Sequence, residues 1–161
     1  MKNNLIVLTV CFLFFFNITK SSAFNFETKT LKIIKEKNLV IASEGKAYLS
    51  GSDLEIRADR FEYKKDLGIL ESNGNGLLII KSKNIKIKFD KSTYDQKNST
   101  LIAEGNIEIN EFNKNIYIET QEIFYDKKNN FISSSTKTLL KDNFQNSYLV
   151  KSFNFDIEKN I

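Results

Sequence analysis

Over much of the chain after Lys37, apolar and polar residues alternate with a period of two. In the segment 54–59 every second residue is apolar and the residues between are charged, and the segment 85–90 repeats this arrangement. Alternation at this step puts apolar side chains on one face of a β-strand and charged side chains on the other. The many Ile, Phe, Tyr and Thr residues suit half-buried strands, and helical spacing is not sustained after Lys37. The pattern therefore predicts an all-β fold.

The alternating segments are copies of one unit. Tyr63, Tyr94 and Tyr125 follow one another at intervals of 31 residues, and a polar turn follows each of them. A single copy cannot bury its apolar face alone, whereas stacked copies share one continuous interior. The same shift superposes two further sets of apolar positions, which are Leu54, Ile85 and Ile116, and Ile56, Ile87 and Ile118.

A glycine marks an equivalent place in three of the copies. Gly45, Gly74 and Gly105 each follow a short stretch that begins with Ile or Leu. A glycine inside a strand pattern predicts a β-bulge or a tight bend. The second copy has two glycines in the segment 73–77, so we expect its strand to bulge there. In the fourth copy Thr136 stands in place of the glycine, and the repeat decays.

Each copy is expected to supply about two strands of roughly nine to eleven residues, joined by turns rich in Asn, Lys, Gly and Asp. The chain contains no proline, so every strand residue can donate to a hydrogen-bond ladder. The prediction is a long, twisted antiparallel sheet with two walls, open along at least one side and with unpaired edge strands. The sequence stops at Ile161 within the fourth copy. We therefore expect either end-to-end pairing with a partner or continuation in a longer chain.

The first 23 residues have the features of a secretory signal peptide. A positively charged start with Lys2 precedes an apolar run over 5–16, which is shorter than the roughly 20 residues that span a bilayer. Ser21 and Ala23 are the small residues expected before a cut after Ala23. We expect residues 1–23 to be removed and residues 24–161 to form one periplasmic domain. Cys11 lies in the apolar run, so that domain would contain no cysteine.

The charges are nearly balanced. The full chain has 24 Lys and Arg against 20 Asp and Glu, and without Lys2 and Lys20 the balance is 22 against 20. Both signs are interleaved along the strands, which is typical of a solvated surface and not of a nucleic-acid-binding stripe. A cluster of lysines on one polar strand face is likewise interpreted as solvated surface, and contact with phosphate is the alternative. The cluster consists of Lys81, Lys83, Lys86 and Lys88.

The composition argues against an enzyme. The chain has no histidine, and its one cysteine is Cys11, so the commonest catalytic bases, nucleophiles and transition-metal ligands are missing. Carboxylate pairs such as Glu55 and Asp59 fall on the wet strand face. No phosphate-binding glycine loop follows the strands. We expect no catalytic residue, no metal site and no cofactor.

Two segments resemble a known family. The residues 51–74, which include Ala58-Asp-Arg-Phe-Glu-Tyr63, and the residues Leu101-Ile-Ala-Glu-Gly-Asn-Ile-Glu-Ile109 are similar to the OstA-like domains of the lipopolysaccharide transport system. The resemblance covers roughly Val40 to Ile132. The order of the motifs is most similar to the N-terminal periplasmic domain of the outer-membrane component, LptD. The soluble bridge component, LptA, is the second candidate.

The resemblance implies a β-jellyroll, or β-taco, whose groove carries the acyl chains of lipopolysaccharide through the periplasm. It also implies edge-to-edge contact with other β-jellyroll proteins of the same system, and contact with the outer membrane if the chain is part of a longer protein. The repeat tyrosines are interpreted as structural wedges that pack a ring and hydrogen-bond a turn, with ligand contact as the alternative.

The alternating apolar residues have two interpretations. They form an ordinary core, or they line a groove in which the burial of apolar surface holds a lipid at about 25 cal/mol per Å². A third class, a structural β-solenoid such as an adhesin stalk or scaffold, would repeat in the same way around a closed interior. The residues predicted to line the groove are Ile56, Ala58, Phe61, Ile85, Ile87, Phe89, Ile107, Ile109, Ile116 and Ile118.

Overall fold

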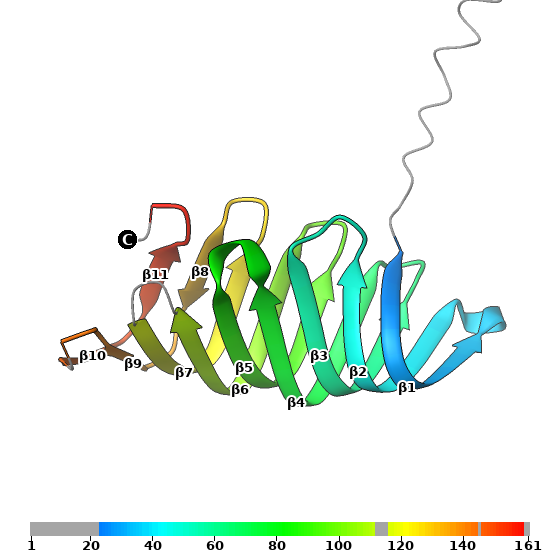
Figure 1. The fold of residues 1–161 in the computed structure, drawn as a ribbon, viewed down its shortest axis with the longest axis horizontal. Coiled ribbons are helices and arrows are strands. Elements are labelled where there is room, and N and C mark those ends of the chain that lie inside the picture. Colours follow the sequence, from blue (N-terminus) through cyan, green and yellow to red (C-terminus); the bar gives the residue numbers. More distant parts are fainter. Residues whose placement is uncertain (1–22, 112–115, 145, 160–161) are drawn as a thin grey trace, which may run out of the picture.

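One antiparallel β-sheet runs through the whole described part of the chain (Figure 1). The computed structural model describes residues 23–111, 116–144 and 146–159. Apart from Ala23, the predicted signal peptide with Cys11 lies outside the described residues, and its prediction stays untested. The strands are β1 (Phe24–Ile34), β2 (Leu39–Leu49), β3 (Leu54–Lys64), β4 (Ile69–Ile80), β5 (Ile85–Asp95), β6 (Thr100–Glu111), β7 (Ile116–Asp126), β8 (Phe131–Ser134), β9 (Thr138–Lys141), β10 (Ser147–Val150) and β11 (Phe153–Asp156), with short 3₁₀ turns η1 (Lys35–Lys37) and η2 (Lys81–Lys83).

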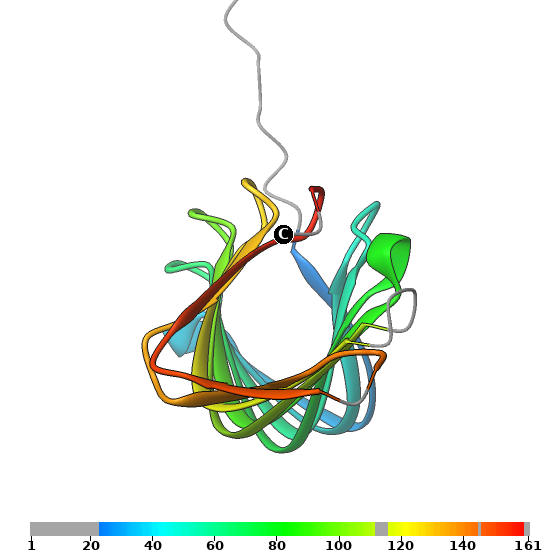
Figure 2. The same ribbon diagram turned by 90° about the vertical axis from the view of Figure 1, so that its left-hand side faces the viewer.

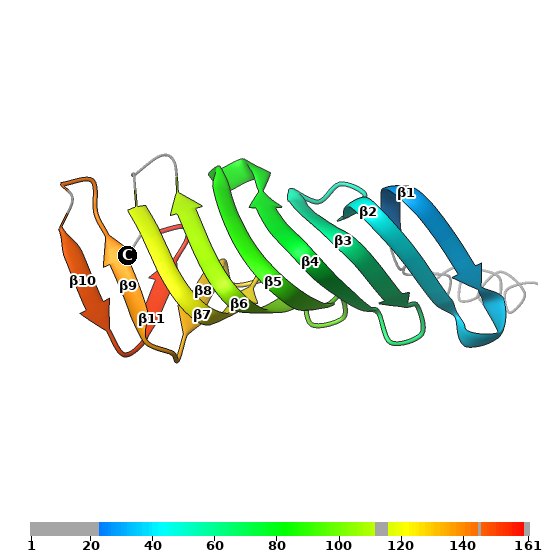
Figure 3. The ribbon, with the colours of Figure 1, turned by 90° about the horizontal axis from the view of Figure 1, so that it is seen from below.

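The strands follow one another in the sheet in chain order. From β1 to β7 each strand pairs antiparallel with the next, and Figure 3 shows them lying side by side at a common slant. β8 and β9 both pair with β7, β8 near Phe124 and β9 near Ile118. β8 and β9 therefore share the position beside β7. β11, which pairs with β8, and β10, which pairs with β9, share the next position. The all-β prediction is confirmed.

The sheet bends along its length into a trough, which Figure 2 shows end-on. The bend coincides with bulges, since the pairing register shifts between Asn73 and Gly76 and again between Glu104 and Ile107. Gly74 has a φ of 77° and lies inside the first of these shifts. The bulges predicted at Gly74 and Gly105 are confirmed, whereas the pairing through Gly45 keeps its register on both sides.

A local hydrogen bond fixes the geometry of each bulge. Asn75, at a φ of 46°, donates from Nδ2 to Asp59 Oδ2 at 2.8 Å. A Cβ at position 74 would lie 2.6 Å from the same Asp59 oxygen, so glycine is required for space as well as for backbone conformation. Gly105, Asn106 and Asp90 repeat this arrangement in the following copy.

The fourth copy, which lacks the glycine, breaks its strand at the equivalent place. Thr136 lies between β8 and β9, inside a cluster of hydroxyl groups. Thr120 Oγ1 is 2.8 Å from Thr136 Oγ1 and 3.0 Å from Ser134 Oγ, and Thr138 donates to the same Thr120 oxygen at 3.0 Å. These buried hydroxyls satisfy one another where the regular ladder is interrupted.

The inner face of the trough consists of two walls of apolar side chains. Cross-strand pairing carries each row from strand to strand, and almost all members of the two rows are buried. The isoleucine wall is the row Ile56, Leu78, Ile87, Ile109, Ile118 and Leu140. The tyrosine wall is the row Val40, Tyr63, Leu70, Tyr94, Leu101, Tyr125 and Ile132.

The turns beside the tyrosine wall stack by a repeated backbone hydrogen bond. Each turn ends in a residue with positive φ whose carbonyl oxygen accepts the amide of the next turn at 2.8–3.0 Å. The stacked turns form one continuous edge of the trough, which we call the tyrosine rim (residues 65–68, 96–99 and 127–130). The accepting residues are Asn38, Gly68, Ser99 and Asn130.

One carboxylate of the outer face is buried. The side chain of Glu55 is 4% exposed and pairs with Arg57 at 2.7 Å and with Lys81 at 2.9 Å. Burial raises the pKa of Glu55, but the hydrogen bonds from Lys81 and Arg57 outweigh it, so the pKa lies below its usual value of 4.5. This carboxylate therefore stabilises the folded state in its ionised form.

The glycine at the bulge can be tested against a glycine in open space. We expect Gly74→Ala to lower the free energy of unfolding by about 2 kcal/mol or more, because it adds a clash with Asp59 to the cost of a left-handed alanine. Gly51→Ala is the matched control, since Gly51 has a φ of 73° and a Cβ added there would meet no atom within 4 Å. It should cost about 1 kcal/mol. Equal losses in urea denaturation would contradict the proposed clash.

The buried ion cluster predicts a dependence of stability on pH. Since the pKa of Glu55 is lower in the folded state, its stabilisation is present above pH 4.5 and is lost as the pH falls below that value. We expect Glu55→Gln to destabilise the protein by about 1 kcal/mol at pH 7 and by much less near pH 3. Glu44→Gln, which removes an exposed pair with Lys29, should have little effect at either pH. A Glu55→Gln deficit that persists unchanged near pH 3 would exclude this role.

Candidate functional site

All ten residues predicted to line a groove belong to the apolar interior. Nine of them are buried, and Ile116 is partly buried and packs against the same cluster. Ile56, Ile87, Ile109 and Ile118 are members of the isoleucine wall, and Phe89 lies against Gly76, in space that a Cβ at position 76 would fill. The structure thus brings the ten residues together in one apolar interior.

The middle of the trough is filled by its own side chains. Phe61, Ile87 and Leu101 each have 0% exposure, and the ring centroid of Phe26 lies 6.0 Å from that of Phe61. The sequence predicted a groove open along at least one side, whereas here the large side chains of the interior are fully buried. In this conformation the central part of the trough is a packed core.

The three repeat tyrosines are part of that core. Tyr63, Tyr94 and Tyr125 are between 1% and 3% exposed. Tyr63 donates its hydroxyl hydrogen to Gln96 Oε1 at 2.9 Å, in a turn of the tyrosine rim. Burial raises the pKa of all three phenols, so they remain neutral hydrogen-bonding groups at physiological pH. This geometry favours the interpretation of these residues as structural wedges.

Side chains also bridge the mouth of the trough. Phe24, at the start of β1, places its ring 5.2 Å from Tyr63 and 5.7 Å from Tyr94, both edge-on. Lys127, in the tyrosine rim, donates from Nζ to Ser52 Oγ at 2.7 Å and lies 3.7 Å from Asp53 Oδ1. Ser52 and Asp53 belong to the turn between β2 and β3, on the opposite side of the mouth. These contacts close the trough over its central part.

The interior opens into an apolar cavity at the end formed by the last strands. The cavity has a volume of about 290 Å³, and its wall is mostly apolar. Ile116 and Ile118 of the predicted set line it, together with residues that the sequence reasoning missed. The alternation in the segment 153–155 was the signal that could have identified two of them. The missed apolar residues are Leu140, Tyr148, Phe153 and Phe155.

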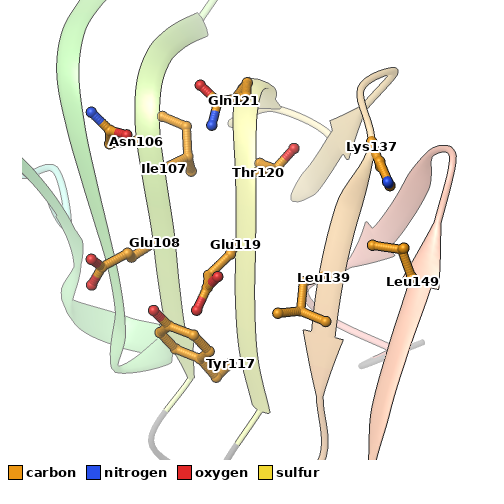
Figure 4. A pocket seen from close by; sticks show the side chains of 10 residues that line it. All are labelled: Asn106, Ile107, Glu108, Tyr117, Glu119, Thr120, Gln121, Lys137, Leu139 and Leu149. Carbon is orange, nitrogen blue, oxygen red and sulfur yellow. The ribbon is translucent and has the colours of Figure 1, made fainter.

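A larger hollow of about 440 Å³ lies on the outer face of β6, β7 and β9, and its character is different (Figure 4). Glu108, Tyr117 and Glu119 lie together at one end of it. Each carboxylate has a cationic partner, Lys88 at 2.8 Å for Glu108 and Lys141 at 3.4 Å for Glu119. This hollow is polar, and both of its carboxylates are paired.

The chemistry available in the trough is apolar contact. Among residues 23–111, 116–144 and 146–159, no three His, Cys, Asp or Glu side chains gather as a metal site would require. Near the outer hollow, burial and the hydrogen bond to Glu119 raise the pKa of Tyr117 to about 12, which leaves its hydroxyl protonated. Within the described residues, no helix is long and apolar enough to cross a membrane.

Comparisons with known proteins identify the fold. The chain matches no known protein family and no curated protein. Among solved structures it is similar to LptH from Pseudomonas aeruginosa, the LptA-homologous periplasmic component of the lipopolysaccharide transport device. The TM-score is 0.53 at 9% sequence identity, and the match covers 65% of this chain and 76% of that one. The chain therefore has the all-β, LptA-like jellyroll fold that the resemblance implied.

Proposed function

We propose that this chain binds lipopolysaccharide in the periplasm, holds its acyl chains between the two apolar walls, and passes the lipid towards the outer membrane. The observation that carries the proposal is the apolar cavity lined by Ile116 and Ile118 at the end of a trough whose fold is that of LptH. The proposed role requires no catalytic residue, metal or cofactor.

Apolar burial supplies the binding energy in this proposal. Each methylene group that leaves water for the trough contributes about 0.8 kcal/mol, so an acyl chain needs no directed polar contact to be held. The cavity at the end of the trough accepts the first part of a chain. Deeper insertion along Ile109 and Ile87 requires the walls to separate, because the side chains around these two buried residues leave them almost no exposed surface. The ten predicted lining residues remain the proposed contacts along that path.

The two ends of the trough are suited to partner proteins of the same architecture. Among the described strands, β1 pairs only with β2, and its inward-facing Leu31 and Ile33 are 48% and 53% exposed. At the other end, Tyr148 and Leu149 of β10 are 49% and 64% exposed. Free edges with large apolar side chains favour pairing with another strand. We propose edge-to-edge contact with other β-jellyroll proteins at these ends.

A structural β-solenoid without a ligand is the competing function. The packed middle of the trough favours it, since a stalk or scaffold needs a closed interior. The cavity beside Phe153 and Phe155 and the exposed Leu31 favour lipid binding, because these features leave apolar surface uncovered at the ends of the core. Lipopolysaccharide enters the interior of a lipid-binding protein but not that of a solenoid scaffold, so its entry distinguishes the two functions.

Photocrosslinking at neighbouring positions of β7 tests the proposal. A photoreactive amino acid at Ile116 or Ile118, which line the cavity, should form a covalent adduct with purified lipopolysaccharide. The same amino acid at Tyr117 points to the outer face, because successive strand residues alternate between faces. We expect at least a tenfold higher adduct yield at Ile116 and Ile118 than at Tyr117, measured by immunoblotting after illumination.

The outcome decides between the two functions. Adducts absent from both inner positions, in protein whose circular dichroism shows intact β-structure, would favour the solenoid scaffold. Equal yields at all three positions would indicate adsorption to the surface and would also contradict the proposal.

A further inference from the structure

In the described part of the chain, a polar bridge from Lys127 spans the mouth of the trough, between two edges that are each held together internally. We propose that Lys127, bound to Ser52 and Asp53 across the mouth, is a latch, and that loading of lipid requires this latch to open. The inference rests on the proposed function, since it concerns the route by which an acyl chain reaches the interior.

The edge opposite the tyrosine rim is fixed by Asp53. We call this edge the isoleucine rim (residues 50–53 and 81–84). Asp53 accepts the amide of Lys81 on its backbone oxygen at 3.0 Å, and its Oδ2 accepts the hydroxyl of Ser82 at 2.5 Å. These bonds join the β2–β3 turn to η2. The second carboxylate oxygen, Oδ1, is the one that faces Lys127.

The tyrosine rim is joined in the same way. Gln96 donates its amide to the Gly68 oxygen at 2.9 Å, and Lys127 donates its amide to the Ser99 oxygen at 3.0 Å. The backbone of Lys127 is thus fixed to its own rim while its side chain reaches the other one. That side chain is 25% exposed, so most of it lies between the rims.

The bulges give the trough a line along which it can bend. Gly74 and Gly105 lie where the pairing register shifts, with φ values of 77° and 76°. Each wall continues from this line as a regular ladder to its own rim. The two rims can therefore separate as units by small backbone changes at the bulges, once the contacts between them are released.

The interaction that holds the latch closed is weak enough to break and form again. The ion pair of Lys127 with Asp53 is long, at 3.7 Å, and both side chains keep contact with water, so the pair is weak and lipid can displace it. The contact of Phe24 with Tyr63 and Tyr94 also spans the mouth and is apolar. An inserted acyl chain replaces that apolar contact with another, whereas the polar bridge of Lys127 must break. Opening of this bridge is therefore the step that a covalent link between the two rims would block.

A reversible covalent link across the mouth tests this inference. Ser52→Cys and Lys127→Cys, joined by a short reducible bis-maleimide in protein with Cys11→Ser, fix the two rims together. We expect the linked protein to retain at least tenfold less lipopolysaccharide on size-exclusion chromatography than the same protein before linking, and reduction of the linker to restore loading. The control, Asp66→Cys with Lys97→Cys, joins two turns of one rim, where Lys97 Nζ already contacts the Asp66 oxygen at 3.1 Å.

Each result has one meaning. Loss of loading in the cross-mouth pair alone supports the latch. Undiminished loading in that pair overturns it and leaves lipid binding in place, with entry from the end of the trough. Loss of loading in both linked pairs also overturns it, because a link within one rim would then be enough to prevent loading. If no form retains lipopolysaccharide, linked or unlinked, the proposed function itself fails.

A variant without a linker gives a second measurement. Lys127→Met keeps the apolar stem and removes the charge, so we expect lipid to load about two to five times faster, as for the loss of one weak ion pair. Lys97→Met removes a rim lysine that contacts only its own rim in the described structure and should leave the rate unchanged. A rate for Lys127→Met equal to that of Lys97→Met would overturn the latch.

Discussion

The structure depends on one constraint, which is the alternation of apolar and charged residues along its strands. The sheet made by these strands bends along the row of bulges. Because every strand from β1 to β7 carries its buried apolar residues on the same face, a flat sheet would expose that face to water. The bulges at Gly74 and Gly105 fold the sheet so that the face covers itself. The same bend that creates the core therefore also creates the trough, and stability and the proposed function depend on the same side chains.

This shared use explains why the interior is closed in the middle and open at the ends. From β1 to β5, the ring of Phe24 reaches across the interior to Tyr63 and Tyr94. At the ends the rows have no further strand to pack against in the described structure, so residues such as Leu31 and Phe155 remain partly accessible. Under the proposed function, the protein exchanges its own apolar contacts for those of the lipid, and so loses little burial on loading.

The parts of this account that the sequence predicts are those with local causes. The strands follow from alternation within each copy, and the bulges follow from glycines such as Gly105 at repeated positions. The mouth could not be predicted, because the contact between Ser52 and Lys127 joins residues 75 positions apart and depends on how deeply the sheet bends. The packed middle was missed for the same reason, since alternation indicates which face a residue occupies but not what lies opposite.

The most direct test of the central claim is a methyl NMR spectrum of isoleucine-labelled protein, recorded with a lipid that carries a nitroxide on its acyl chain. If the chain lies between the walls, the methyl signals of the inward residues Ile87, Ile109 and Ile118 broaden. The signals of Ile79 and Ile102, on the outer face, stay sharp. Broadening confined to the outer residues, or none at saturating lipid, would contradict a trough that carries lipid.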